Sequence, residues 1–412
     1  MSSSHSQDTD DRQGSTLAQT LSRKLGELSR HFQELQNDLT ATPATRWGVD
    51  AALALQTRLT EMQNLTQELY ERCVESETRL QNLLRSDESI WFRPTYLSPS
   101  RIPKFVPISE RPTAPGGRTT RFLSFINLKG GVGKTTLTAN VVAAFASGNF
   151  CDLDGRSGRP ARVLAVDLDF QGTLSQRCVA PDVLRRAYEN DLTSSLLLRR
   201  PKPPKVALSA LAVPFLGCPT AEVVPANDKL DGIDVLRLNE HACRYREPRY
   251  YYRLWFHRPE VFASYDYVVF DCPPRLTASS VAALVASDFI FMPTAPESFD
   301  VNAVSRTLNW LGVTIEKLRL SARFAGAVLN RTYSEKRLSP PELKNKAKIK
   351  LFYEDFCENF NVASPFSPTL ETFIPRRSGG NYINGPDGAE LPGVSSQYFN
   401  ALASEIQRRI CQ

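Results

Sequence analysis

The sequence lacks any apolar run that approaches the roughly 18 residues needed for a membrane-spanning helix. Its first residues are rich in Ser, Asp and Gln, and they lack the apolar segment of a secretory signal. The 8 cysteines form no CxxC pair, and Cys243 near His241 is too small a group for a metal site. We therefore expect a cytoplasmic protein with reduced thiols and no stable membrane insertion.

Charge is unevenly distributed along the chain. Residues 1–115 carry 13 basic and 15 acidic side chains, a net charge of −2. Because the whole chain has a net charge of +6, the residues after 115 carry +8. A basic C-terminal portion suits a polyanionic partner. A length of 412 residues with 42% hydrophobic residues fits a soluble chain of two or three domains.

The first quarter of the chain reads as a helical extension behind a short tail. Residues 1–14 are polar and predict a disordered tail. Within 15–93, apolar residues recur every three or four positions, which predicts amphipathic helices. A break at 40–45 contains Pro43, so the pattern suggests a helical hairpin or coiled coil. Self-packing of the hairpin and docking of a partner or second subunit both remain open.

A Pro- and Gly-rich linker is expected at 94–118, since this stretch cannot form a regular helix. From 119 to 412, apolar strand patterns alternate with helical ones. This alternation predicts an α/β domain with a mostly parallel sheet that has helices on both faces.

A glycine-rich loop lies between the first strand pattern, 122–128, and a helical pattern, 137–146. This order of strand, loop and helix is that of a phosphate-binding loop, the P-loop. Backbone N–H groups of such a loop surround phosphate oxygens, and the helix presents its positive end to the anion. The loop residues are Lys129, Gly130, Gly131, Val132, Gly133, Lys134, Thr135 and Thr136. We expect Lys134 to reach the β- and γ-phosphates and Thr135 to ligate Mg²⁺.

The run 129–136 resembles the deviant Walker A motif of the ParA and MinD ATPases, written KGGVGKT[TS]. The resemblance implies ATP and Mg²⁺ as cofactors. It also implies that Lys129 is the signature lysine, which reaches the nucleotide of a partner subunit in an ATP-dependent homodimer. A solvated loop lysine is the alternative interpretation of Lys129.

Two strand ends carry acidic residues that suit Mg²⁺ binding and the positioning of a water molecule. The strand pattern 163–166 ends in Asp167 and Asp169, which resemble the family motif DxDxQG, with Phe170 where the family usually has Pro. The resemblance gives Asp169 the task of positioning the attacking water and Asp167 that of supporting the metal. The pattern 267–270 ends in Asp271 and resembles a Walker B strand, which implies that Asp271 holds Mg²⁺. Cys272 is expected to be a buried, inert thiol.

Weaker matches cover the rest of the domain. The segments 222–227, 290–297, 325–330 and 373–377 resemble later strands and loops of ParA proteins. By this resemblance Asn330 is a candidate contact of adenine. The alternative is that Asn330 caps the following helix.

Basic clusters are candidate DNA contacts, since ParA proteins bind DNA non-specifically through phosphate contacts. On a helix, the alternating lysines of 344–350 spread rather than form one stripe. A third cluster near 244–253 is interleaved with Tyr250 to Tyr252, which we expect in the core. The terminal apolar face, from Phe399 to Ile410, predicts packing on the domain rather than membrane binding. The main candidates are Arg331, Lys344, Lys346, Lys348, Lys350, Arg376 and Arg377.

The sequence thus predicts a slow, partner-stimulated ATPase that closes as a homodimer, resembling the ParA and Soj proteins of chromosome or plasmid partitioning. That resemblance implies non-specific DNA and a ParB-like activator as partners. The alternatives are a nucleotide-gated scaffold that recruits a partner through the N-terminal helices, and MinD-like positioning at a membrane.

Overall fold

The computed structural model divides the chain into two compact units, 1–90 and 91–412. In the first unit it describes residues 30, 34, 37, 53, 56–62, 64 and 90, and residues 56–62 are helical. The tail and most of the predicted helical extension lie outside the described residues. In the second unit it describes 91, 92, 95, 97–113, 117–148, 159–199, 208–242, 246–333, 337–362, 366–376 and 396–411, without the side chains of 298–302 and 396.

The second unit is built on an eight-stranded sheet with the order β3-β4-β2-β5-β1-β6-β7-β8. All neighbours pair in parallel except β3 and β4. This confirms the predicted mostly parallel α/β sheet. The strands are β1 (Arg121–Phe125), β2 (Val163–Asp167), β3 (Val213–Pro214), β4 (Ala221–Val224), β5 (Tyr267–Asp271), β6 (Phe289–Thr294), β7 (Arg323–Thr332) and β8 (Ile374–Pro375).

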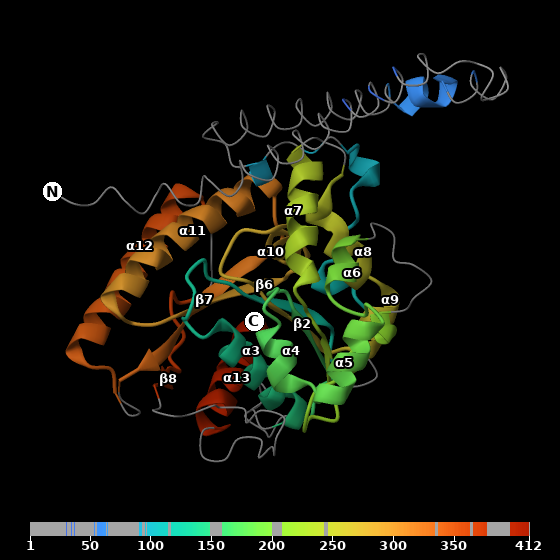
Figure 1. Ribbon diagram of the computed structural model, residues 1–412. Coiled ribbons are helices and arrows are strands. Elements are labelled where there is room, and N and C mark those ends of the chain that lie inside the picture. The colour runs from blue at the N-terminus through green and yellow to red at the C-terminus, as the bar shows by residue number, and fades with distance from the viewer. Residues whose placement is uncertain are drawn as a thin grey trace. The chain divides into compact units, whose positions relative to one another are not determined.

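Helices cover both faces of this sheet. One face carries α3 (Lys134–Ser147), α4 (Thr173–Cys178), α5 (Pro181–Glu189) and α13 (Ser396–Ile410) (Figure 1). The other carries α7 (Lys229–Ala242), α8 (Tyr251–Phe256), α10 (Ala278–Ala286), α11 (Ser298–Leu318) and α12 (Pro340–Asn359). Two short helices, α6 (Ser195–Arg199) and α9 (Pro259–Ser264), lie near α8 (Figure 1). Short 3-10 turns form η1 (Ile90–Phe92), η2 (Pro99–Arg101), η3 (Ile108–Glu110), η4 (Leu208–Ala210) and η5 (Pro248–Tyr250).

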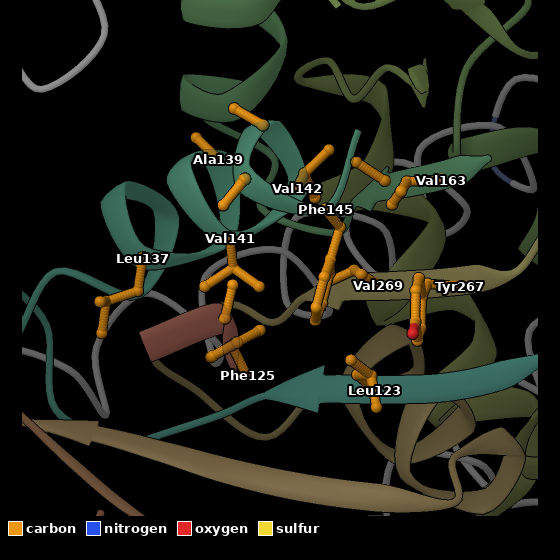
Figure 2. Close-up of a cluster of buried hydrophobic side chains, with 14 of the residues drawn as sticks. Leu123, Phe125, Leu137, Ala139, Val141, Val142, Phe145, Val163, Tyr267 and Val269 are labelled. Atoms are coloured by element: carbon orange, nitrogen blue, oxygen red, sulfur yellow. The ribbon is translucent and has the colours of Figure 1, made fainter. Parts of the chain in front are cut away.

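The core follows the period of two that strands impose. Leu123 and Phe125 of β1 belong to the buried cluster under α3, whereas Phe122 stacks on His257 on the opposite face. Figure 2 shows the first cluster, in which the rings of Phe145 and Tyr267 are stacked with centroids 4.4 Å apart. A strand buried on both faces explains why the sequence shows continuous apolar runs here.

The helix α13 completes the cluster on the α3 face. Its apolar residues Phe399, Leu402, Ile406 and Ile410 are all buried, which confirms the predicted packing on the domain. Arg409 of this helix is buried as well and donates hydrogen bonds to the carbonyls of Ala325, Ser367 and Thr369. The helix therefore fixes β7 and the segment before β8 by both apolar and polar contacts.

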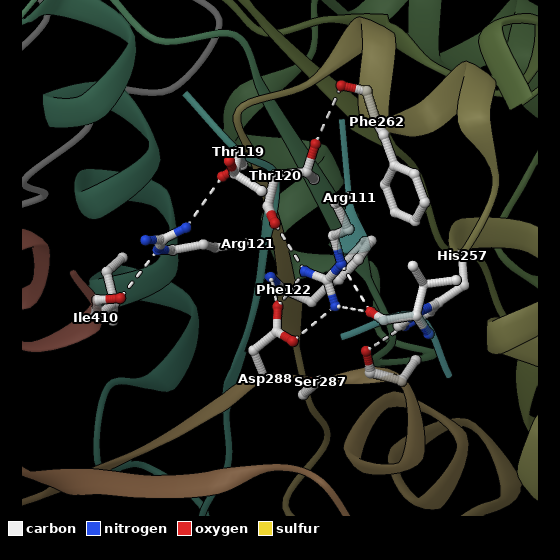
Figure 3. Close-up of polar contacts among 12 residues, drawn as sticks. Arg111, Thr119, Thr120, Arg121, Phe122, His257, Phe262, Ser287, Asp288 and Ile410 are labelled. Carbon is white, nitrogen blue, oxygen red and sulfur yellow. Dashed lines mark hydrogen bonds and ion pairs between the residues drawn. The ribbon is translucent and has the colours of Figure 1, made fainter. Parts of the chain in front are cut away.

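A buried ion pair ties residues 97–113 to the sheet. The guanidinium of Arg111 donates to both carboxylate oxygens of Asp288, at 2.6 and 2.7 Å, and to the carbonyls of Val106 and Thr120 (Figure 3). Asp288 immediately precedes β6 and also accepts a hydrogen bond from the amide of Phe122. Residues 97–113, which make up much of the predicted linker 94–118, are thus packed on the sheet.

His257 holds the same segment from a second side. The amide of Val106 donates to Nδ1 of His257, and Nε2 lies 2.8 Å from the carbonyl of Ala286. The ring is therefore neutral, with its proton on Nε2. Burial lowers the pKa of His257 to about 3, so the ring stays neutral across the physiological range.

We predict that Arg111→Ala lowers the free energy of unfolding by about 3–5 kcal/mol, because it leaves the buried Asp288 carboxylate without its partner. Burial already raises the pKa of Asp288 and Arg111 opposes that rise. Without Arg111, the folded state takes up a proton more readily than the unfolded state, so the deficit shrinks as the pH falls from 8 to 5. Urea unfolding at both pH values measures this.

The double variant Arg111→Ala/Asp288→Asn is the control, because it removes the uncompensated charge. It is expected to be more stable at pH 8 than Arg111→Ala alone. A single variant that unfolds like the wild type at pH 8 would contradict the role of the ion pair.

Candidate phosphate-binding site

The candidate site lies at the carboxyl edge of β1, β5 and β2, which are neighbours in the sheet. The loop after β1 leads directly into α3, while Asp167 and Asp271 are the last residues of β2 and β5. In open parallel sheets this edge is where ligands bind, between the strand ends and the helix N-termini. The structure therefore brings together all three phosphate motifs found in the sequence.

Gly133 joins the loop to the helix. It is the N-cap of α3 with φ of 86°, a left-handed conformation that favours glycine. A Cβ at this position would lie 2.1 Å from Nδ2 of Asn330, so no other residue fits without displacing that side chain. At Gly131, by contrast, an added Cβ would have nothing within 4 Å, so the outer part of the loop borders open space.

Three side chains hold carbonyl groups of the loop. Nζ of Lys134 donates to the carbonyl of Lys129 at 2.8 Å. Nδ2 of Asn330 donates to the carbonyl of Val132 at 2.9 Å, and Nη1 of Arg331 donates to that of Gly131 at 2.8 Å. The loop is thus fixed from α3 on one side and from the end of β7 on the other.

Asn127 is a further residue of the site that the sequence reasoning missed. It is buried after β1, its Nδ2 donates to the carbonyl of Pro293, and its Oδ1 accepts from the amide of Lys129. These bonds fix the first residue of the loop to the end of β6. The available signal was a polar residue at the end of an otherwise apolar strand, directly before the glycines.

The two strand-end acids lie side by side, because Asp167 of β2 pairs in register with Asp271 of β5. Both oxygens of Asp167 are engaged, one with the amide of Asp169 and the other with the amide and hydroxyl of Ser175. Asp167 therefore anchors the start of α4. Ser175, which the sequence reasoning also missed, accepts in turn from the amide of Ala226.

Both acids resist ionisation in the protein alone. Burial raises the pKa of Asp271, and the neighbouring Asp167 raises it further, while the hydroxyls of Thr135 and Thr138 oppose the shift. Burial is also the main reason that the pKa of Asp167 is raised. Lys134 is affected in the opposite sense: burial lowers its pKa, and Asp271 opposes that change. A cation beside the acids would stabilise their charged forms.

Asp271 has the features expected of a metal ligand. Its Oδ1 accepts from the hydroxyl of Thr138 at 3.1 Å, whereas its buried Oδ2 has no hydrogen-bond partner. An orphaned carboxylate oxygen near the Thr135 hydroxyl fits Mg²⁺, which is commonly bound by one or two protein oxygens together with phosphate and water. Among the described residues, no group of three or more His, Cys, Asp or Glu could hold a metal, so no all-protein metal cage is found there.

Asp169 is partly exposed, unlike the other two acids, and its Oδ1 accepts from the amide of Gln171. Next to it, the ring of Phe170 lies 4.7 Å from the guanidinium carbon of Arg275, a residue that follows the Walker B strand. Lys129 is also partly exposed. The two residues assigned to water positioning and to the partner nucleotide are thus those on the open side of the site.

The helix-cap interpretation of Asn330 is wrong. The next described helix, α12, is capped by Ser339 together with Glu342, and Asn330 instead contacts the phosphate loop and the amide of Arg331. Contact with adenine stays a prediction for this residue. Cys272 is buried as expected, and burial raises the pKa of its thiol, which leaves it protonated.

The candidate DNA contacts occupy different environments. Lys344 and Lys348 are exposed and lie four residues apart on α12, so they share a face. Lys346 contacts Glu371 and Lys350 contacts Glu354, at 3.2 and 3.7 Å. Arg376 is exposed after β8, and Arg377 lies outside the described residues.

The interpretation of the third basic cluster, near 244–253, as a surface patch is wrong. Arg249 is buried, and its guanidinium donates to both carboxylate oxygens of Glu247. The buried Arg253 donates to the carbonyl of Val285. Arg244 lies outside the described residues. The tyrosines 250–252 are buried as predicted, and the flanking Arg249 and Arg253 are buried with them, whereas Arg246 is exposed.

This fold and this loop define a P-loop nucleotide-binding domain. The family model described as an AAA domain matches residues 120–323, which span all three phosphate motifs. Together with the relatives below, this match shows that residues 120–323 are similar to P-loop ATPases of the ParA/MinD type.

Several curated proteins are similar to the chain. An uncharacterized protein of Mycobacterium tuberculosis is 32% identical over 221 residues, 54% of this chain and 58% of that protein. The chromosome partitioning protein ParA of Caulobacter vibrioides is 31% identical over 201 residues, 48% of this chain and 63% of that protein. The sporulation initiation inhibitor Soj of Bacillus subtilis is 28% identical over 211 residues, 51% of this chain and 72% of that protein. The match thus spans less than two thirds of the first two proteins.

Among solved structures, that of pNOB8 ParA superimposes with a TM-score of 0.52 at 20% identity, covering 71% of this chain and 98% of that chain. This likeness supports the fold. In the part of the chain that the structure describes, no helix is both long and apolar enough to cross a membrane.

We predict that the ligand-free protein loses stability as the pH rises from about 4, the ordinary carboxyl range, to neutrality. The reason is that Asp167 and Asp271 have raised pKa values, so the folded state binds more protons than the unfolded state in this window. Asp271→Asn removes one of these charges and is expected to raise the Tm at pH 8 more than at pH 5. Calorimetry of both proteins without divalent cations measures the effect.

Proposed function

We propose that this protein is a slow, Mg²⁺-dependent ATPase of the ParA type that works as a dimerisation switch in the positioning of DNA. The observation that carries the proposal is the meeting of the phosphate loop, Asp167, Asp169 and Asp271 at one edge of the sheet. Relatives named as chromosome partitioning proteins match about half of the chain, at 28% and 31% identity.

The proposed roles follow from the environment of each group. The loop amides and Lys134 would bind the phosphates, while Thr135 and Asp271 would hold Mg²⁺, with Asp167 behind them. Magnesium, when bound, would neutralise charge on the phosphate oxygens. Asp169 would orient the attacking water, since its carboxylate is the acid on the open side of the site.

Dimerisation would complete the site. Lys129 lies at the start of the loop with its side chain partly exposed. A second subunit that faces this loop would receive the lysine at its own nucleotide, where a cation stabilises charge that develops during phosphoryl transfer. The chain would thus couple ATP binding to association and hydrolysis to release.

DNA binding would use the exposed lysines of α12. Lys344 and Lys348 share one face, and the chain beyond residue 115 carries a net charge of +8 (+6 minus −2). Such contacts go to phosphates and carry no sequence information. A ParB-like protein is the proposed activator, by analogy with the partitioning relatives.

A second candidate function is a nucleotide-gated scaffold. Residues 1–90 form a compact unit of their own, and the described residues of this unit include the exposed apolar side chains of Leu53 and Met62. Large exposed apolar side chains on a helix suit a partner surface. Binding of ATP without binding of DNA would favour this function over the first.

We predict that Lys134→Ala abolishes nucleotide binding, because the loop loses its main phosphate charge. Asp169→Ala should still bind ATP and hydrolyse it about 10²- to 10⁴-fold more slowly, the range for loss of an acid–base group. Fluorescent-nucleotide titration and phosphate release measure the two steps. Asp182→Ala on α5 is the matched control, since this aspartate is exposed and outside the site. Equal turnover in wild type and Asp169→Ala would contradict the role of Asp169.

We also predict that ATP converts the monomer to a dimer in light scattering, and that Lys129→Ala prevents this. The chain for this test starts at Trp91, because the N-terminal helices could dimerise without ATP and residues 97–113 are packed on the sheet. Lys104→Ala, which removes an exposed lysine outside the site, is the control. If ATP leaves the truncated wild type monomeric, the sandwich dimer is wrong.

Binding to arbitrary duplex DNA should weaken with salt, with a log–log slope of about −0.9 per phosphate contact. Lys344→Glu/Lys348→Glu should weaken binding equally for all sequences and leave DNA-free ATPase activity unchanged. Lys317→Glu/Arg319→Glu, at the end of α11 and directly after it, makes the same charge change at two exposed residues elsewhere and serves as the control. Fluorescence anisotropy with ATP and Mg²⁺ gives the slopes, and a salt-insensitive signal would count against phosphate contacts.

A further inference from the structure

We propose that Arg331 is a positioning residue of the phosphate loop: with Asn330, it turns two peptide groups of the loop so that their N–H groups face away from β7. The inference rests on the proposed function only in that the loop binds a nucleotide. It assigns to Arg331 a task that differs from the DNA contact considered for it above.

The backbone of Arg331 is specialised for this task. Its φ is 63°, a left-handed conformation that side-chain-bearing residues rarely adopt. The pairing of β7 with β8 also shifts register between Asn330 and Thr332, so Arg331 forms a bulge in the strand. Bulges often re-aim a side chain beside a functional site. Here the bulge directs the guanidinium to the loop, where Nη1 lies 2.8 Å from the carbonyl of Gly131.

The planarity of the peptide bond converts this contact into an orientation. In a trans peptide, the C=O of one residue and the N–H of the next point in opposite directions. Because Arg331 holds the carbonyl of Gly131, the N–H of Val132 points away from β7. Because Asn330 holds the carbonyl of Val132, the N–H of Gly133 does the same.

The two side chains act as one unit. Oδ1 of Asn330 accepts a hydrogen bond from the amide of Arg331 at 2.9 Å, which fixes the asparagine amide in the orientation that donates to the loop. The asparagine is buried, and it fills the space that a Cβ on Gly133 would need. The end of β7 thus selects one arrangement of two flexible, glycine-flanked peptides.

An arrangement with N–H groups on one side of a loop is an anion-binding concavity. Glycine-flanked peptides can rotate easily, so a loop without these donors would sample orientations that present carbonyl oxygens instead. Fixing the carbonyls in advance reduces the ordering that a phosphate must impose on binding. Arg331 is therefore expected to strengthen the binding of nucleotides without touching them.

The test compares Arg331→Ala with Arg331→Lys and with Arg319→Ala in the full chain. Arg319 is a matched control, because it is also an arginine with positive φ, 48°, and it lies after α11, toward the opposite end of β7. The measurements are ADP affinity by calorimetry, the Tm without nucleotide, and the rise in Tm that saturating ADP produces. Salt-dependent DNA binding with saturating nucleotide is measured in parallel.

We expect Arg331→Ala to weaken ADP binding about tenfold, since hydrogen bonds from charged donors are the stronger class. Its Tm without nucleotide should stay near that of Arg319→Ala, while the ADP-dependent rise becomes smaller. Arg331→Lys, which keeps a charged donor, should recover part of the affinity. The salt slope for DNA should not change.

Three results would overturn the inference. Wild-type ADP affinity in Arg331→Ala would show that the contact does not organise the loop. A lower Tm without nucleotide, with the ADP-dependent rise intact, would show a structural role only. A salt slope smaller by about 0.9 with unchanged ADP affinity would make Arg331 a DNA contact. If the wild type itself binds no ADP, the proposed function fails first and this inference falls with it.

Discussion

Because β5 is hydrogen-bonded between β1 and β2, three strand ends meet at one edge of the sheet, and the site depends on that pairing. The register sets Asp167 beside Asp271, and the loop that follows β1 lies next to both. A shift of one residue in either pairing would turn these carboxylates to the opposite face. The apolar residues that alternate along the strands prevent such a shift, so the core fixes the chemistry of the edge.

This arrangement has an electrostatic cost. Burial raises the pKa of both carboxylates, and the neighbouring Asp167 raises that of Asp271 further. Asp167 is compensated by three hydrogen bonds, whereas Asp271 keeps a buried oxygen without a partner. The difference separates an anchoring acid from one suited to a cation, although the sequence presents both in the same way, at the end of a strand.

The phosphate loop, the strand-end acids and the parallel sheet could all be predicted, because each depends on residues that are close in sequence. Arg111 and Asp288 lie 177 positions apart, and no local sequence pattern predicts their pairing. Arg249 and Arg253 were misread because a count of charges does not report burial. Asn127 and Ser175 were missed for a related reason, since Pro293 of β6 and Ala226 after β4, which they contact, lie far from them in the sequence.

The packing of α13 has a consequence for how the chain reaches its native state. This helix closes the face that α3 presents, and Ile410 accepts a hydrogen bond from Arg121 at the start of β1. During synthesis, the apolar side of α3 that α13 covers in the native state therefore stays exposed until residue 410 has left the ribosome. Contacts so distant in sequence form slowly. The nascent chain thus exposes hydrophobic surface for a long interval, and we expect chaperones to bind it during synthesis.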